Sequence, residues 1–413
     1  MKSRIPTIVQ NNIEAPLEEF LRKGDYRSCA IISDIRTHRV MGARVEDVVR
    51  RHVAETRQVR FDQDEVLADE QTVFKTFRAL PGPMELFISV GSGTITDITR
   101  FVAHRIGADF LALPTAPSVD GFTSYSSPLV IDGFKQTVVG MPPTRIITDP
   151  EVLCRAPAKM IAAGFGDVLG KTTAVADWRL AAVLADGEFD QQVAEDVTEA
   201  FQVTLAGASE IGRRSPEAIE TLFRALAVTG ESMARVGSSA PASGSEHQFS
   251  HFLEMKLLHD RRPAVLHGAK VALGTLVSAA LYERLRGLTP EAVATHTVVL
   301  PDFAGDADRI RRFLGAGGEQ IIADQQKLMR TKLDEVEALR GKLLERWEEV
   351  QQIAAGVPSP QILAEALVAA GGETEPEELG FTRKEFEIAA YLSHYVRTRF
   401  SVQKLFYLLQ LER

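Results

Sequence analysis

The feature that most limits the fold is a change in hydrophobic pattern near residue 150. Before it, short apolar runs rich in β-branched residues alternate with helix-like segments. The predicted strands are residues 29–32, 86–90, 110–113 and 145–148, and the predicted helices between them are residues 45–59 and 97–106. Strands that alternate with helices form a parallel sheet with crossover connections. After residue 150 the apolar residues recur with a period near 3.6, which is typical of helices.

This change predicts two domains, and a chain of 413 residues is long enough for two hydrophobic cores. Residues 1–150 would form an α/β nucleotide-binding domain with a Rossmann-like parallel sheet, and residues 151–413 an all-α domain. The predicted helices of the second domain are residues 167–184, 191–211, 216–236, 245–258, 268–286, 318–354, 360–370 and 383–411. Within it, the charged segment from Asp324 to Glu349 predicts a solvent-exposed helix to which we attach no chemistry.

A β-hairpin is also predicted in the first domain. Residues 129–131 and 137–139 are apolar and β-branched, and they bracket Asp132-Gly133-Phe134-Lys135. A turn that contains glycine between two such runs is typical of a hairpin.

Charge and cysteine content exclude several classes of function. The net charge is −9 and the pI about 5.6, so the chain has no general attraction for nucleic acid or anionic membranes. Cys29 and Cys154 are the only cysteines, which excludes a disulfide framework and a Cys-rich zinc site. The first residues lack a signal-peptide pattern, and no run of about eighteen apolar residues predicts a membrane span. We therefore expect a cytoplasmic globular protein.

Two loops after predicted strands carry the first candidate binding residues. The first is Gly91-Ser92-Gly93-Thr94-Ile95-Thr96-Asp97, which leads into a helix. Glycines let backbone N–H groups approach a phosphate, and a helix N-terminus adds partial positive charge. The spacing is not G-x-G-x-x-G, so a phosphate loop and an ordinary strand-to-helix turn both fit.

The second loop runs from Pro114 to Ser124 and also follows a predicted parallel strand, where open α/β sheets bind ligands. Its hydroxyl groups, its prolines and the carboxylate of Asp120 suit a preformed polar pocket. An ordinary loop in which Ser118 or Asp120 caps a helix explains the same residues.

The helical half holds a candidate metal site. Asp167 is predicted near a helix start, where an N-cap role also explains it. His247 and His251 lie one turn apart if their segment is helical, and His267 opens an apolar helix. One aspartate and two or three histidines suit a divalent ion with open positions. His259 instead fits a solvated helix end. Without an H-E-x-x-H motif, a metalloprotease lacks its general base.

Five motifs in chain order resemble those of the sn-glycerol-1-phosphate dehydrogenase family. They are GSGTITD, PTAPSVDGFTS, GFGDVLGK, GSEHQFSH and LHGAKVALGT, and the resemblance covers roughly residues 28–285. Together they indicate the superfamily of iron-type alcohol dehydrogenases, glycerol dehydrogenase and dehydroquinate synthase. PTAPSVDGFTS and GSEHxxSH favour the glycerol-phosphate branch. The resemblance implies a dehydroquinate synthase-like fold and NAD- or NADP-linked interconversion of dihydroxyacetone phosphate and sn-glycerol-1-phosphate.

The resemblance also implies roles for single residues. The metal ligands would be Asp167, His247 and His267, and Asp167 would also meet the substrate. Asp120 and His251 would contact the substrate and could relay a proton. The implied cofactor contacts are Asp34 at the adenosine ribose, Gly91, Gly93, Thr94, Ile95, Thr96 and Asp97 around the pyrophosphate, and Thr115, Ala116, Pro117, Ser118 and Ser124 along the remaining cofactor. Zinc, nickel or iron would suit these ligands and would act as a Lewis acid during hydride transfer.

Two positions depart from the family pattern. Ser92 stands where the family often has a third glycine, which should be tolerated if its φ is negative. Ala269 replaces an acidic or amide residue common after the His-Gly pair, and that position could orient a metal ligand. The substrate phosphate needs a basic residue, and Lys171 and Lys270 are candidates by their nearness in sequence. An apolar helical half favours self-association, so we expect a homo-oligomer such as a dimer.

Three alternatives remain open from the sequence. The first is a glycerol, polyol or other alcohol dehydrogenase on the same scaffold, which a panel of substrates would separate. The second is a dehydroquinate synthase-like lyase, which uses NAD only transiently and consumes no reduced nicotinamide. The third is a nucleotide-binding scaffold without chemistry, against which the intact set of Asp167, His247 and His267 argues.

Overall fold

The computed structural model describes residues 5–63, 65–131 and 134–411. The chain divides into two compact units. The first is made of Met1–Phe165 and Ser209–Arg235, and the second of Gly166–Ala208 and Val236–Arg413. The first unit therefore includes a helical segment from the second half of the sequence.

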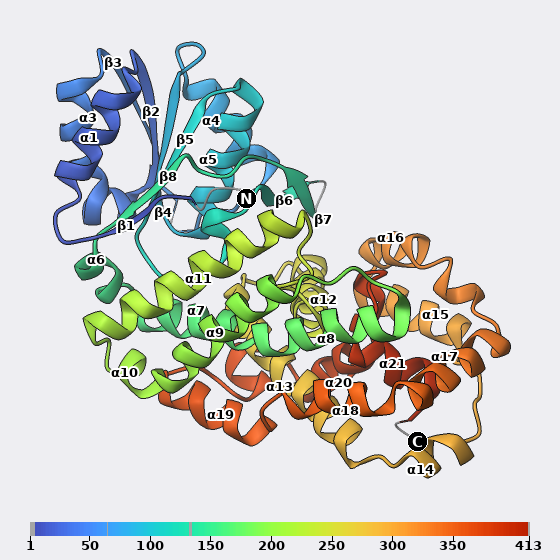
Figure 1. Ribbon diagram of the computed structural model, residues 1–413. Coiled ribbons are helices and arrows are strands. Elements are labelled where there is room, and N and C mark those ends of the chain that lie inside the picture. Colours follow the sequence, from blue (N-terminus) through green and yellow to red (C-terminus); the bar gives the residue numbers. More distant parts are fainter. Residues whose placement is uncertain (1–4, 64, 132–133, 412–413) are drawn as a thin grey trace. The chain divides into compact units, whose positions relative to one another are not determined.

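A six-stranded parallel sheet forms the centre of the first unit (Figure 1). The strands are β1 (Thr7–Val9), β2 (Ser28–Asp34), β3 (Glu55–Phe61), β4 (Leu86–Gly91), β5 (Asp109–Pro114) and β8 (Arg145–Thr148), in the order β1-β8-β5-β4-β2-β3. The strand order reverses between β2 and β4, and open sheets bind ligands beyond the carboxyl ends at such a point. Asp34 ends β2 and Gly91 ends β4, so both lie at this position.

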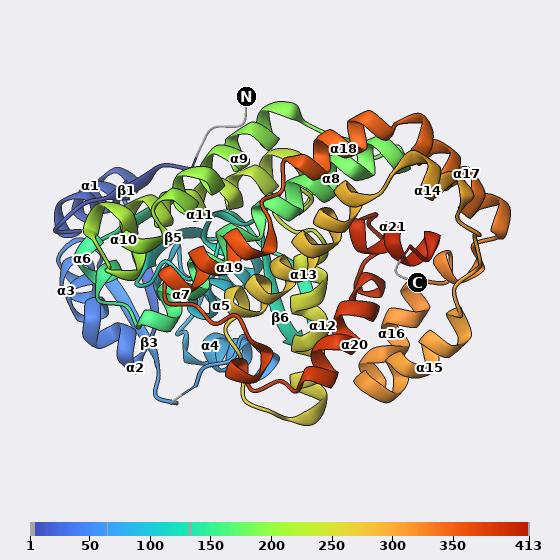
Figure 2. The ribbon, with the colours of Figure 1, turned by 90° about the horizontal axis from the view of Figure 1, so that it is seen from below.

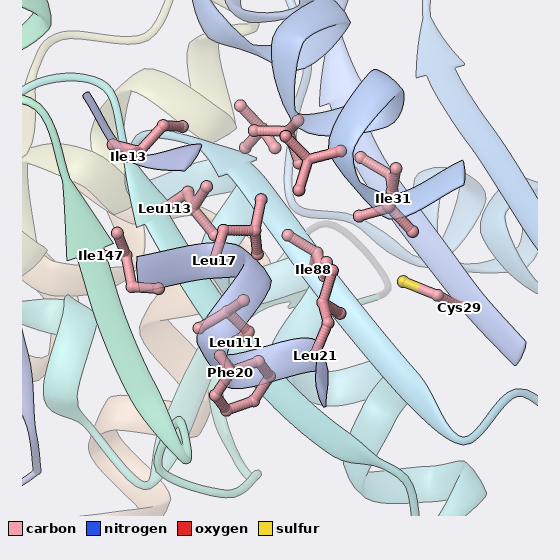
Figure 3. Close-up of a cluster of buried hydrophobic side chains, with 14 of the residues drawn as sticks. Ile13, Leu17, Phe20, Leu21, Cys29, Ile31, Ile88, Leu111, Leu113 and Ile147 are labelled. Carbon is pink, nitrogen blue, oxygen red and sulfur yellow. The ribbon is translucent and has the colours of Figure 1, made fainter. Parts of the chain in front are cut away.

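Apolar side chains explain why this sheet is covered by helices. The helices of the first unit include α1 (Glu14–Gly24), α2 (Ile35–Thr37), α3 (Ala43–His52), α4 (Glu70–Ala79), α5 (Gly93–Ile106), α6 (Pro150–Cys154), α10 (Ala208–Gly212) and α11 (Pro216–Val236). Leu17 and Leu21 of α1 pack on Ile88, Leu111 and other buried strand residues (Figure 3). Figure 1 shows α1 and α3 on one side of the sheet and α4 and α5 on the other.

The prediction of a helix over residues 45–59 is wrong in its second half. Helix α3 ends at His52, and residues Glu55–Phe61 form the edge strand β3, which pairs in parallel with β2. Only Val59 and Phe61 of this strand are buried, and its other side chains are mostly polar. Pairing with β2 therefore overrides a weak local preference for helix.

The predicted hairpin is confirmed by the antiparallel strands β6 (Ser126–Ile131) and β7 (Phe134–Val139). The turn residues Asp132 and Gly133 lie outside the described residues. A short 3-10 helix, η2 (Gly121–Thr123), precedes the hairpin and holds part of the loop predicted to line the cofactor.

The described residues of the second unit are helical and contain no strand. Their helices are α8 (Lys171–Ala185), α9 (Gln191–Ala206), α12 (Ser245–Asp260), α13 (His267–Gly287), α14 (Pro290–Thr295), α15 (Phe303–Leu314), α16 (Ala316–Asp324), α17 (Leu333–Glu345), α18 (Trp347–Ala355), α19 (Pro360–Ala369), α20 (Arg383–Leu392) and α21 (Val402–Leu409), with the 3-10 helix η5 (Ser393–Val396). Helices α12 and α13 lie side by side, and α20 and α21 pack alongside them (Figure 2). None of the described helices combines the length and apolar character needed to cross a membrane.

Two long predicted helices are interrupted in the structure. The segment 318–354 is divided among α16, α17 and α18, and the segment 383–411 among α20, η5 and α21. The prediction that Asp324 to Glu349 is one exposed helix is therefore wrong. Val336 and Leu343 are buried seven residues apart on α17, which anchors this charged segment to the helices beneath it.

Candidate metal centre and cofactor loops

Three helices bring Asp167, His247 and His267 to one place in the second unit. Each offers a ligand atom, and these atoms all lie within 4.8 Å of one another. Asp167 and His247 are buried, and His267 is half buried. His247 lies in the first turn of α12 and His267 begins α13, as predicted. The prediction that Asp167 lies at a helix start is wrong, because it is near the end of α7 (Ala158–Leu169).

Close packing of these helices depends on two glycines. A Cβ atom on Gly166, next to Asp167, would lie 2.5 Å from the carbonyl oxygen of Gly268 in α13. A Cβ atom on Gly274 would lie 2.5 Å from the carbonyl oxygen of Glu246 in α12. Both distances are too short for any side chain, so hydrogen at these positions lets α7, α12 and α13 approach closely.

Charged neighbours fix two of the three donors. The ammonium of Lys171 donates to Asp167 Oδ1 at 2.7 Å and to the carbonyl oxygen of Ala242 at 3.1 Å. His247 Nδ1 lies 2.7 Å from Glu246 Oε1, and Glu246 also accepts from Thr173 Oγ1 at 2.7 Å. A carboxylate on one ring nitrogen fixes the tautomer, so that the other nitrogen can bind a metal. His247 Nε2 is the nitrogen that lies 3.6 Å from Asp167 Oδ1.

These contacts set the charge of the donors. Burial raises the pKa of Asp167, but Lys171 and the two imidazoles outweigh it, and the net pKa lies well below the usual value. Burial also raises the pKa of Glu246, and His247 with Thr173 and the Gly244 amide lowers it overall. Two ionised carboxylates therefore stand beside the imidazoles, which is the charge state that a divalent cation needs.

Removing the carboxylate partner of His247 should weaken metal binding. We expect Glu246→Gln to lower the affinity for a divalent ion roughly 10- to 100-fold, because an amide in that position no longer holds the imidazole firmly in one tautomer. Competition with a chelator, read by metal analysis of the dialysed protein, measures the change. Glu283→Gln on the exposed side of α13 is the matched control. An unchanged affinity in Glu246→Gln would show that the carboxylate does not support the site.

His251 lies next to the three donors without joining them. Its ring centroid is 6.4 Å from that of His247 and 5.8 Å from that of His267. It is half buried one turn after His247 on α12. His251 is thus not one of the three donors, and its contact with the substrate stays a prediction.

Neither lysine suggested for the substrate phosphate is available for it. Lys171 is fully buried and bonded to Asp167. Lys270 is also fully buried, and its ammonium donates to Glu254 and, at 2.7 Å, to the carbonyl oxygen of Val265. Both ammonium groups thus compensate nearby carboxylates, so the phosphate must find its cations elsewhere.

The glycine loop of the first unit joins β4 to α5. Ser92 is the N-cap of α5 with φ −95°, which meets the condition for a serine at this position. Its hydroxyl lies 2.5 Å from Ser118 Oγ rather than capping the helix, so the side chain ties the two predicted loops together. A Cβ atom on Gly93 would lie 3.0 Å from Val119 Cγ2. No side chain caps the start of α5. The backbone N–H groups from Gly93 to Ile95 thus form an uncapped helix N-terminus, which is the kind of site that binds phosphate.

Arg100 shapes the second loop, a role that the sequence pattern did not indicate. It is fully buried and donates to Asp97 Oδ1 at 2.7 Å and to the carbonyl oxygens of Gly121, Phe122 and Ser126 at 2.5, 3.1 and 3.1 Å. Asp97 thus holds Arg100 in place. The local sequence shows only an arginine in a helix of mixed apolar and polar residues.

The remaining predicted residues lie on the second loop, except Asp34, which ends β2. Asp120 is buried just before η2, and Ser124 Oγ bonds within the loop to the carbonyl oxygen of Ser126 at 3.1 Å. The others of the second loop, Thr115, Ala116, Pro117 and Ser118, directly follow β5 and are buried. Asp34 caps α2 by accepting from the amides of Arg36 and Thr37, both at 2.8 Å.

Known dehydrogenases are similar to this chain in sequence. A family model described as iron-containing alcohol dehydrogenase matches residues 8–157. The chain is 36% identical over 344 residues to the NAD(P)+ glycerol-1-phosphate dehydrogenase of Bacillus licheniformis, covering 81% of this chain and 86% of that protein. It is 30% identical over 376 residues to the enzyme of the same name from Geobacillus thermodenitrificans. That match covers 90% of this chain and 84% of the Geobacillus protein.

Solved structures share the fold at lower identity. Glycerol dehydrogenase from Schizosaccharomyces pombe aligns with a TM-score of 0.57 at 18% identity, covering 93% of this chain and 94% of that chain. Sulfoacetaldehyde reductase from Bifidobacterium kashiwanohense, solved with NAD+, aligns with a TM-score of 0.60 at 13% identity. The alignment covers 98% of this chain and 96% of the reductase chain. The dehydroquinate synthase-like architecture expected from the sequence is thus confirmed as that of the iron-type alcohol and glycerol dehydrogenases.

Proposed function

The chain belongs to the glycerol-1-phosphate dehydrogenase family, and on that premise we propose that it interconverts dihydroxyacetone phosphate and sn-glycerol-1-phosphate. The cofactors would be NAD or NADP and one divalent metal ion. The observation that carries the proposal is the convergence of Asp167, His247 and His267 within 4.8 Å, since this donor set fits zinc, nickel or iron. A bound ion would supply Lewis-acid polarisation of the substrate carbonyl.

The surrounding residues have defined tasks in this proposal. Lys171 keeps Asp167 ionised, and Glu246 holds the ring of His247 in the orientation that exposes Nε2. His251, half buried beside the donors, would contact the substrate and exchange a proton with it. Asp120 is the second candidate for that contact.

The first unit would hold the nicotinamide cofactor. The uncapped start of α5, from Gly93 to Ile95, offers backbone N–H groups to the pyrophosphate. Asp34 stands at the neighbouring strand end, where it would meet the adenosine ribose. Thr115 to Ser118 and Ser124 would line the remaining cofactor, with Arg100 fixing their loop.

A substrate panel tests this function. We expect NADH or NADPH to reduce dihydroxyacetone phosphate with a kcat/KM at least about 100-fold above that for dihydroxyacetone, because only the former offers a charged group to bind. In the reverse direction, sn-glycerol-1-phosphate should be oxidised much faster than glycerol. Equal rates would move the chain to the glycerol dehydrogenase branch. Turnover without net change in nicotinamide absorbance would instead indicate a lyase.

We propose further that the protein acts in the cytoplasm as a homo-oligomer. Both cysteines are free, as expected for a reducing compartment. Light scattering of the purified protein measures the oligomeric state, and cell fractionation measures the location.

A further inference from the structure

Three cations gather in the segment that joins η5 to α21 in the second unit. We call Arg397, Arg399 and Lys404 the cationic cluster. Lys404 Nζ donates to the carbonyl oxygen of Arg397 at 2.9 Å. Arg399 donates to the carbonyl oxygen of Ser243 and, at 3.1 Å, to Ser239 Oγ. Lys404 is buried, whereas Arg397 and Arg399 are half buried.

One carboxylate links this segment to the helix that carries His247. Asp177 Oδ2 accepts from the amide of Ser245 at 2.7 Å, and its Oδ1 accepts from the amide of Val402 at 2.7 Å. Ser245 begins α12 and Val402 begins α21. The first turn of α12, with His247, and the first turn of α21, with Lys404, are therefore held side by side.

A second connection runs along the backbone just before α12. Lys171, which is bonded to Asp167, donates to the carbonyl oxygen of Ala242 at 3.1 Å. The next carbonyl oxygen, that of Ser243, accepts from Arg399. The cationic cluster thus lies beside the candidate metal centre, within the same unit.

The charges of Lys404 and Arg397 are not compensated by carboxylates of the described residues, unlike those of the other buried cations. Among the described residues, the fully or nearly fully buried cations besides Lys404 are Arg100, Lys171 and Lys270, and each pairs with a carboxylate. No carboxylate forms an ion pair with Lys404 or Arg397 in the part of the chain that the structure describes. Burial lowers the pKa of Lys404 to about 7 and also lowers the pKa of Arg397. A carbonyl oxygen is a neutral partner, and a buried cation without an anionic partner is strongly unfavourable, so this segment favours a bound anion.

Neutral polar groups of the adjoining elements also lack partners. Ser243 Oγ, the side-chain amide of Gln248 and both ring nitrogens of His394 are buried without a hydrogen-bond partner in the described structure. Gln248 lies on α12 directly after His247, and His394 lies on η5, which packs against α12. Buried polar groups are nearly always hydrogen-bonded, so a polar ligand bound at these elements would supply partners that the chain does not.

We propose that the cationic cluster binds the phosphate group of the substrate, a small phosphomonoester dianion. The inference rests on the function proposed above and identifies the part of that site that recognises phosphate. Guanidinium groups bind phosphate oxygens in a fork, and an ammonium adds a charged donor. The cluster therefore fills the role that Lys171 and Lys270 cannot, and it explains how an acidic chain selects an anionic substrate.

Kinetics with paired substrates test the proposal. We expect Lys404→Met and Arg397→Gln each to lower kcat/KM for dihydroxyacetone phosphate roughly 10- to 100-fold, mainly through KM, because each removes one charge-assisted contact. The kcat/KM for dihydroxyacetone should stay within about twofold of wild type. Lys384→Met and Arg312→Gln, at exposed positions, are the matched controls. Equal losses with both ketones, or no loss with either, would overturn the proposal.

Binding of inorganic phosphate provides a readout that does not depend on activity. Phosphate should raise the melting temperature of the wild type and of both controls but not that of Lys404→Met or Arg397→Gln. If the wild type prefers the phosphorylated ketone and both variants keep that preference, the proposed function stands and the subsite is refuted. If the wild type does not prefer dihydroxyacetone phosphate over dihydroxyacetone, the proposed function fails. In that case, a rise in melting temperature with phosphate that the two variants lack would still show that the cationic cluster binds an anion.

Discussion

His267→Ala should purify without its divalent ion and should lose activity about a thousandfold or more. A metal contributes several kcal/mol to the stabilisation of developing charge, and each 1.4 kcal/mol is a factor of ten in rate. His267 is one of three donors within 4.8 Å, and loss of one leaves too few ligands for tight binding. Because His267 is half buried at the start of α13, its truncation should leave the fold intact.

Metal analysis together with oxidation of NADH or NADPH measures both parts of this result. His259→Ala is the matched control, since His259 is exposed near the end of α12. Chelation of the wild type should abolish activity, and zinc, nickel or ferrous iron should restore it. A His267→Ala protein that kept a full complement of metal and full activity would place the reaction away from these residues.

Local signals explain which parts of the site could be predicted. The apolar strand before Gly91 and the helix that follows it are encoded by neighbouring residues. The strand appears where the pattern puts it, and the helix, predicted from Asp97, begins at Gly93. The spacing of His247 and His251 likewise places them one turn apart on α12. These features depend on the period of the sequence and on the conformational preferences of glycine.

Long-range packing explains what could not be predicted. The sequence before Asp167 suggested a helix start, whereas α7 begins at Ala158, extends past Asp167 and packs against α13 at Gly166. The strand Glu55–Phe61 forms only because β2 lies beside it. No spacing rule connects Arg399 with Ser243, although the two are hydrogen-bonded in the fold.

The role of Glu246 lies between these cases. It stands directly before His247 in a motif that the resemblance singled out, so its position was visible in the sequence. Its function was not, since adjacent helical residues do not usually face each other. Only the bond between Glu246 Oε1 and His247 Nδ1, with Gly244 and Thr173 donating to the same carboxylate, identifies it as the group that orients the imidazole.

Arg100→Met should lower the free energy of unfolding by about 3–5 kcal/mol, the range expected when one partner of a buried ion pair is removed. The variant leaves the carboxylate of Asp97 without its cation and three loop carbonyl oxygens without their donor. The loop that carries Asp120 and Ser124 should therefore loosen, and KM for NADH should rise. Urea denaturation and cofactor titration measure the two effects.

The pH dependence separates a charge effect from a loss of packing. Burial raises the pKa of Asp97 to about 7 even beside Arg100. A carboxyl group whose pKa is higher in the folded than in the unfolded protein contributes to stability while it is protonated. This contribution is lost as the pH rises through the pKa of the folded state. Without the cation the pKa of Asp97 should rise further, so the deficit of Arg100→Met relative to wild type should grow from about pH 7 to about pH 9.

Two controls complete this prediction. The side chain of Arg155 is 80% exposed and forms a surface ion pair with Glu151. Arg155→Met should therefore change the free energy of unfolding by no more than about 1 kcal/mol. The double variant Arg100→Met with Asp97→Leu should recover part of the loss, because the unpaired carboxylate is gone. Recovery should be incomplete, since the carbonyl oxygens of Gly121, Phe122 and Ser126 still lack a donor. A single variant as stable as wild type at every pH would show that Arg100 does not hold the loop.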